Sequence, residues 1–197
     1  MPSDSLTPMQ QAVADIFRQS AQLKDTCARE CAPVVAEMAQ MIVEAYRAGH
    51  TVFIFGNGGS AADAQHLAGE FVNRMLKNRR ALPAVALSTD TSVLTCIAND
   101  SHYSQIFARQ LEALGKPGDI AWGISTSGNS PNVLAAFEQA AGIGMQTIGF
   151  TGGSGGKMAS MADLCLTVPS PTTPRIQEVH ITAGHAICEL VEQMLFP

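Results

Sequence analysis

The stretch Thr51–Glu70, TVFIFGNGGSAADAQHLAGE, constrains the fold most because it joins a buried strand, a glycine turn and a helix start. Thr51–Phe55 is a β-branched and aromatic run, which is typical of a central parallel strand covered on both faces. Gly56–Gly59 follows at once, and glycines there permit positive φ and close approach of a ligand to the backbone. We expect Ser60 to cap the next helix, whose free N–H groups would then form an anion site above the sheet.

His66 and Glu70 follow one turn into that helix, four residues apart, and therefore share one face. An imidazole and a carboxylate beside a ligand crevice indicate either metal binding or proton transfer.

A second informative loop runs from Ser125 to Pro131, between an expected strand and an expected helix that begins at Pro131. We expect Ser130 to be the N-cap residue and Pro131 to be the first helical residue. Hydroxyls at positions 125, 126, 127 and 130 beside a helix N-terminus suit a phosphate group. The alternative is an ordinary serine-rich turn whose hydroxyls satisfy the backbone. Four hydroxyls in six residues at the end of a strand favour phosphate.

Strands and helices alternate five times along the chain, which predicts an α/β fold. The expected architecture is a three-layer αβα sandwich with a five-stranded parallel sheet, whose ligand binds at the carboxyl ends of the strands. The strands are expected at Thr51–Phe55, Ala84–Leu87, Ile120–Ile124, Met145–Phe150 and Leu164–Val168.

Residues 1–50 are expected to form an N-terminal helical arm, and residues 51–197 the α/β domain. The first helix starts at Thr7 with Pro8 and Gln10 in capping-box register. Its apolar stripe either packs on the domain's own core or forms a subunit interface, and we favour the interface because a helix before the first strand is an appendage. The stripe comprises Val13, Ile16, Phe17, Ser20, Leu23 and Cys27.

A long terminal helix is expected over Arg175–Phe196, with Gln177, Ile181 and His185 close to one face. Gly184 permits a close approach, and His185 becomes functional only if this helix packs over the Gly56 crevice, of its own chain or of a neighbour. His180 lies well round the helix and is expected to be structural.

Three other segments are expected to have no functional role. Lys77–Arg80 is expected to be a solvated turn, and Thr151–Gly156 a flexible connection. Cys27 and Cys31 are expected to be buried thiols rather than metal ligands.

The composition excludes several classes of protein. Only 15% of the 197 residues are charged, so much of the surface is expected to be buried against other subunits. The net charge of −5 gives no basic footprint for nucleic acid. No apolar run approaches ~20 residues and no signal peptide opens the chain, so we expect no membrane association and a cytoplasmic location.

The glycine turn also fits the loose dinucleotide fingerprint G-x-G-x-x-A, but the match is weak. The acidic residue that such a site needs about 20 residues on is missing, because Asp90 lies well beyond that distance.

Several motifs together resemble the phosphoheptose isomerases, which are sugar isomerase (SIS) domain proteins. They are GNGGSAADAQHLAGEF (56–71), IAND (97–100), STSGNSPN (125–132), GFTG (149–152) and PRIQEVH…H (174–185). The resemblance covers nearly the whole chain. It implies conversion of sedoheptulose 7-phosphate to D-glycero-D-manno-heptose 7-phosphate, the first step towards the ADP-heptose of lipopolysaccharide, by a cytoplasmic homotetramer with zinc in its active site.

Carried over residue by residue, the resemblance implies that Glu70 and His185 are the catalytic pair. It implies zinc ligation by His66, Glu70, Gln177 and His185. It implies substrate contacts from Asn57, Gly58, Gly59, Glu70, Asn99, Asp100, Ser125, Thr126, Ser127, Ser130 and Gln177. The expected chemistry is proton transfer between adjacent carbons by Glu70, with His185 serving the oxygens.

Two other functions remain open from the sequence. A non-catalytic relative, the initiator-associating protein, binds the bacterial replication initiator, but the resemblance implies that it lacks the carboxylate and the imidazole at positions 70 and 185. A sugar-phosphate-sensing regulatory domain would need the phosphate loop without an acid–base pair. The product anomer and the role of zinc, catalytic or structural, are left undecided.

Overall fold

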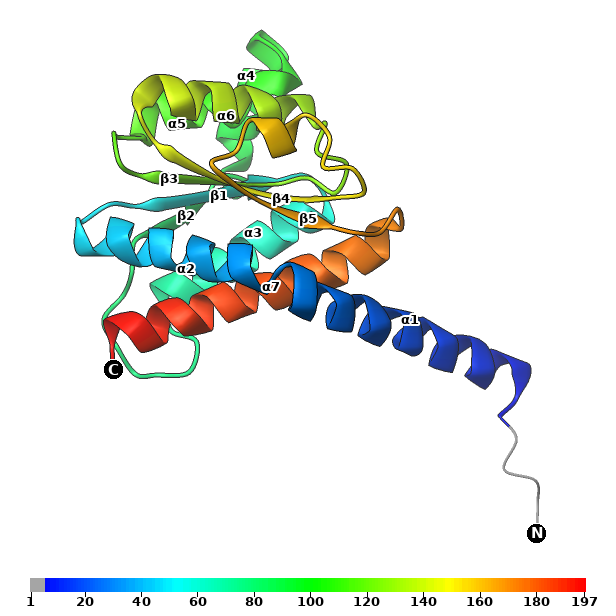
Figure 1. Ribbon diagram of the computed structural model, residues 1–197. Coiled ribbons are helices and arrows are strands. Elements are labelled where there is room, and N and C mark those ends of the chain that lie inside the picture. Colours follow the sequence, from blue (N-terminus) through cyan, green and yellow to red (C-terminus); the bar gives the residue numbers. More distant parts are fainter. Residues whose placement is uncertain (1–5) are drawn as a thin grey trace.

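Five short buried runs form one parallel sheet, as the computed structural model of the chain shows for residues 6–197 (Figure 1). The sheet has the strand order β2-β1-β3-β4-β5, and every neighbouring pair is parallel. The predicted α/β sandwich is therefore confirmed, with each strand within two residues of its expected bounds. The strands are β1 (Val52–Gly56), β2 (Ala84–Ala86), β3 (Ile120–Ile124), β4 (Gln146–Gly152) and β5 (Leu164–Val168).

Helices cover both faces of the sheet, because alternate residues of β1 point into two separate cores. Val52 and Ile54 join one core with α2, α3 and α7, whereas Phe53 and Phe55 join the other with α5 and α6. The helices are α1 (Pro8–Glu30), α2 (Ala32–Arg47), α3 (Gly59–Val72), α4 (Thr91–Asp100), α5 (Ala108–Leu114), α6 (Pro131–Ile143) and α7 (Thr173–Leu195), with 3-10 turns η1 (Tyr103–Gln105) and η2 (Met158–Ser160).

The strand order reverses between β1 and β3, since β1 is followed by β2 on one side and by β3 on the other. A crevice at the carboxyl ends of the strands opens at such a switch point in parallel α/β sheets. The glycine turn follows β1 and the serine loop follows β3, so both predicted ligand loops flank this point.

Helix α1 extends well beyond the body of the domain (Figure 1). Its C-terminal part packs against α2 and α7, and further out the Ile16 carbonyl oxygen accepts a hydrogen bond from Arg175 of α7. The predicted capping box at its start is present. Val13 is 49% exposed and Phe17 72% exposed, whereas Cys27 is buried. The outer half of the apolar stripe therefore does not pack on the chain's own core. Residues 1–5 of the predicted arm lie outside the described residues.

Two expectations about loops are wrong. Helix α3 is capped by Gly58, which has a φ of 56°, and Ser60 is buried inside the first turn. Gly153, Gly155 and Gly156, after β4, adopt positive φ, and the last two pack closely against Ala159 and Ser127, so this segment has a defined conformation.

Two further findings concern helices. The segment from Tyr103 to Leu114 forms two helices, η1 and α5, rather than one. Among residues 6–197, none of the helices is at once long enough and apolar enough to cross a membrane.

Candidate active site at the switch point

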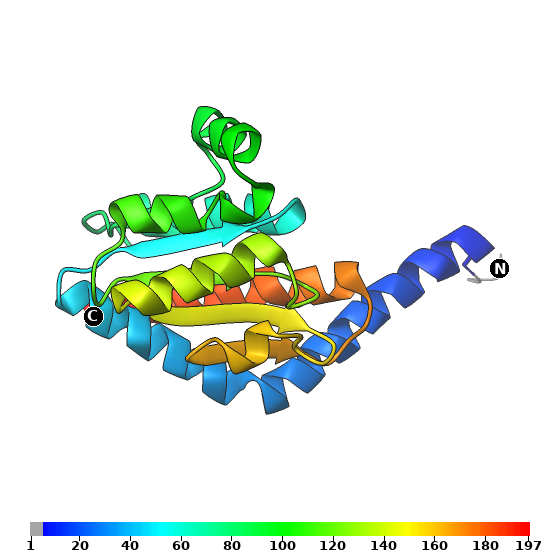
Figure 2. The same ribbon diagram turned by 90° about the horizontal axis from the view of Figure 1, so that it is seen from above.

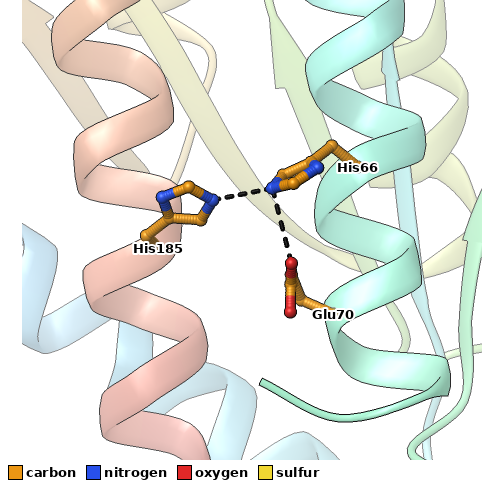
Figure 3. A group of neighbouring side chains, drawn as sticks. All are labelled: His66, Glu70 and His185. Carbon is orange, nitrogen blue, oxygen red and sulfur yellow. Dashed lines mark hydrogen bonds and ion pairs between the residues drawn. The ribbon is translucent and has the colours of Figure 1, made fainter. Parts of the chain in front are cut away.

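Three side chains that the sequence separates meet between α3 and α7 (Figure 3). The Nε2 atoms of His66 and His185 are 2.7 Å apart, and His66 Nε2 lies 3.4 Å from Glu70 Oε1. One potential ligand atom from each residue lies within 4.8 Å of the other two. Helix α7 thus packs against α3 of its own chain, which meets the condition that the sequence set for a functional His185.

Two glycines allow α7 to approach α3 this closely. A Cβ atom on Gly184 would lie 2.7 Å from Leu67 Cδ2, and one on Gly59 would lie 2.6 Å from Gln177 Nε2. Real Cβ contacts are longer, so a larger residue would displace the buried Leu67 side chain or α7 at position 184, and the Gln177 amide at position 59. Gln177 therefore lies over the first turn of α3, about two helical turns before His185.

The donor set fits a zinc ion. Imidazole nitrogen and carboxylate oxygen are common zinc ligands, and here they come from two rigid helices. The two Nε2 atoms point at each other, an arrangement that is stable when one ring donates a hydrogen bond or when both bind a cation. Among the described residues, no other three His, Cys, Asp or Glu side chains bring their ligand atoms within 4.8 Å of one another.

Asp63 belongs to the same face of α3, which the sequence interpretation missed. Burial raises the pKa of its carboxyl group, and the nearby His66 and His185 oppose that shift. The sequence does carry a signal for this. Asp63, His66 and Glu70 are spaced by three and then four residues, which places them on one face of a helix.

The glycine turn is held through Asn57 by two side chains that the sequence did not single out, Asn132 and Tyr103. Asn57 and Asn132 exchange two amide hydrogen bonds, of 2.9 and 2.7 Å, and the Tyr103 hydroxyl donates to Asn57 Oδ1 over 3.2 Å. The side-chain oxygen of Asn57 therefore already accepts two hydrogen bonds. One N–H of the Asn57 side-chain amide remains free to donate.

Three of the four hydroxyls of the serine loop lie close together. Ser125 Oγ lies 2.8 Å from Ser130 Oγ and 3.4 Å from Ser127 Oγ. Ser130 is the N-cap residue of α6, but its side chain makes no capping hydrogen bond. Thr126 and Ser127 line an open hollow of about 270 Å³ with residues 152–154 and the start of α7.

Asn99 and Asp100 are not brought to this group within one chain. Both are exposed in the last turn of α4, which projects from the body, and the Asn99 amide donates to Asp100 Oδ1 over 2.7 Å (Figure 2). Within residues 6–197, no hydrogen bond or ion pair links either residue to α3 or α7.

His180, Cys27 and Cys31 are buried, as expected for residues with a structural role. His180 is 1% exposed, its Nε2 lies 3.0 Å from the Thr151 carbonyl oxygen, and burial lowers its pKa to about 4. Cys27 and Cys31 are both buried, and burial raises the pKa of the Cys27 thiol to about 12.

The five-stranded sheet and the two loops at its switch point define an SIS domain, and the SIS domain family model matches residues 16–152. A phosphoheptose isomerase from Roseiflexus sp. (strain RS-1) is 53% identical over 195 residues, which cover 99% of this chain and 98% of that protein. Within the SIS domain proteins, this chain belongs to the phosphoheptose isomerase family.

Solved structures agree with this assignment. A phosphoheptose isomerase from Neisseria gonorrhoeae superposes with a TM-score of 0.90 at 41% identity, over 94% of this chain and 99% of that one. One from Francisella tularensis gives a TM-score of 0.91 at 37% identity, over 95% of this chain and all of that one.

Proposed function

We propose that the chain is an aldose–ketose isomerase that converts sedoheptulose 7-phosphate to D-glycero-D-manno-heptose 7-phosphate. The observation that carries this proposal is the meeting of Glu70 with the two imidazoles beside the loops of the switch point. Family membership supports the substrate class.

Isomerisation moves a proton between adjacent carbons through an enediol, so it needs a base near C1 and C2 and an acid for the oxygens. We assign the first role to Glu70, whose carboxylate projects from α3 into the gap between the helices (Figure 3). His185, on the facing helix, would exchange protons with the hydroxyl and carbonyl oxygens. A nitrogen that binds a metal cannot also be the general acid, so these roles of His185 must involve different atoms or alternate.

His66, Glu70, Gln177 and His185 would hold a zinc ion, which supplies Lewis-acid polarisation of a carbonyl oxygen when bound. The donor set and the mutual approach of His66 and His185 support this assignment.

We assign the phosphate group to the serine loop, where Ser125, Thr126, Ser127 and Ser130 offer hydroxyls and the start of α6 offers N–H groups. Asn57–Gly59 would contact the sugar, with Asn57 donating its free N–H. Asn99 and Asp100 would contact substrate from the end of α4, of this subunit or of another, since neither has a hydrogen bond to the group between α3 and α7 within one chain.

The non-catalytic alternative is not favoured. The relatives named above are phosphoheptose isomerases, and the chain retains both the carboxylate at position 70 and the imidazole at position 185 in mutual reach.

We further propose a homotetramer in which the exposed stripe of α1 is an interface, because Val13, Ile16 and Phe17 are largely exposed in the single chain. The family resemblance supports a cytoplasmic location and a place at the first step towards ADP-heptose.

Turnover of sedoheptulose 7-phosphate by the purified protein, with metal analysis of the same sample, tests the proposal. Replacing the carboxylate by an amide in Glu70→Gln should lower kcat at least about 100-fold, a typical contribution of acid–base catalysis. Substrate affinity, measured by calorimetry, should stay within a few-fold. The exposed Glu138 on α6 provides the matched control, Glu138→Gln, which should keep wild-type turnover. Near-normal turnover by Glu70→Gln would defeat the assignment.

A further inference from the structure

The connection between α3 and β2 is held by one buried carboxylate on α7. Glu192 has a side chain that is 2% exposed, and it accepts hydrogen bonds from the backbone N–H groups of Met75 (3.1 Å), Leu76 (2.8 Å) and Lys77. Burial alone would raise the pKa of this carboxyl group, but these hydrogen bonds and the ion pair with Arg79 outweigh burial and hold the pKa below its usual range. The carboxylate is therefore charged and fully partnered.

Arg79 connects that carboxylate to the end of α3. Its side chain is also 2% exposed, and its Nε donates to Glu192 Oε2 over 2.8 Å. Nη1 donates to the carbonyl oxygen of Phe71 (2.9 Å), and Nη2 donates to that of Glu70 (2.8 Å). These carbonyls belong to the last turn of α3, where no helical N–H remains to bond them. The guanidinium group therefore caps α3 and is ion-paired with α7.

Both ends of this connection lie close to the candidate active site. The capped carbonyl belongs to Glu70 itself, and Glu192 lies seven residues, about two turns, after His185 on α7. A rigid bridge at this level sets the spacing of α3 and α7, and hence the spacing between the Glu70 carboxylate and the His185 imidazole.

We propose that Arg79 and Glu192 are positioning residues for the reaction, which hold α3 and α7 at the separation that the Glu70–His185 pair requires. The inference rests on the proposed isomerase function. It assigns a role to Arg79, which neither touches the loops of the switch point nor takes part in proton transfer.

Kinetics of three variants test the proposal. Arg79→Met should lower kcat about 10- to 100-fold with KM within threefold of wild type, because small misplacements of reacting groups act on the chemical step. Arg79→Met/Glu192→Gln leaves no unpaired buried charge, so it should lose less thermal stability than Arg79→Met, while kcat of the folded protein remains at least tenfold below wild type. Arg80→Met is the matched control, since it removes the neighbouring, exposed charge and should keep kcat within threefold.

A merely structural role predicts a different pattern. If the double variant folds and turns over substrate at the wild-type rate, the positioning role is refuted, and the same holds if activity falls only in proportion to the folded fraction. If Arg79→Met does not fold, the kinetics of the double variant alone decide the question.

A second readout does not depend on turnover. In histidine-labelled protein, the ring ε1 resonances of His66 and His185 should shift in the double variant and stay unchanged in Arg80→Met. Unchanged resonances in the double variant would overturn the proposal. If the wild-type protein proved inactive while the double variant still shifted these resonances, the isomerase function would be contradicted. The positioning of α3 and α7 by Arg79 and Glu192 would then still be supported.

Discussion

Substitution of Gly184 by alanine should separate the two helices that form the site. The new Cβ atom would lie 2.7 Å from Cδ2 and 2.8 Å from Cδ1 of Leu67. Leu67 is fully buried, so its side chain cannot turn towards solvent. Relief must therefore come from a shift of α7 away from α3, at the residue next to His185.

The expected cost follows from two opposing effects. Overpacking in a core costs about 1–3 kcal/mol, and a conflict with both methyl groups of one leucine places it near 3 kcal/mol. Alanine gains about 1 kcal/mol over glycine inside a helix. The net loss is about 2 kcal/mol, which should lower Tm by about 4–8 °C for a chain of this length.

Gly142→Ala is the matched control, because Gly142 is also helical and a Cβ atom there would meet nothing within 4 Å. That variant keeps the helical gain alone, so its Tm should rise by about 2–4 °C. Calorimetry at one protein concentration should give shifts of opposite sign, and isomerase turnover should fall only in Gly184→Ala. A Tm of Gly184→Ala at or above wild type would refute the close-approach argument.

Three further predictions test other parts of the molecule. Ser130→Ala should raise KM about 10- to 100-fold, the range expected for one hydrogen bond to a charged phosphate, and an unchanged KM in steady-state assays would argue against the serine loop as the phosphate site. The buried His180 has a folded-state pKa of about 4 against 6.5 for the free side chain, so the unfolded chain binds more protons between these values. The free energy of unfolding is therefore highest above pH 6.5 and falls by up to about 3 kcal/mol as the pH drops to 4. In urea unfolding, His180→Gln should show a weaker dependence of this free energy on pH between 4 and 6.5. Phe17→Asp should reduce the assembly size measured by light scattering, whereas an intact assembly would exclude the exposed part of α1 from the interface.

The sheet and its ligand loops could be predicted from the sequence because their signals are local. Buried β-branched runs marked the strands, and glycine and serine clusters marked the loops that follow β1 and β3. The pairing of α3 with α7 was predicted only conditionally, since the docking of a terminal helix depends on contacts across more than a hundred residues.

Lys77–Arg80 shows where local interpretation fails. A run of basic and amide residues indicates a solvated turn, yet Arg79 is buried because its partner, Glu192, lies 113 residues away. Ser60 was expected at the cap, but Gly58 takes that place with a positive φ that L side chains rarely adopt. Asn132 and Tyr103 were missed because their contacts with Asn57 exist only once α6 and η1 pack beside β1.

The reciprocal amide pair between Asn57 and Asn132 has a consequence for how a ligand is received. It fastens the turn after β1 to the first turn of α6, so the floor of the crevice forms one preassembled piece. The entropy of arranging these loops is lost during folding rather than at each encounter with a ligand. A sugar phosphate would then meet a surface already shaped for it, bordered by the exposed Tyr103 ring, whose hydroxyl is held by the same Asn57 oxygen.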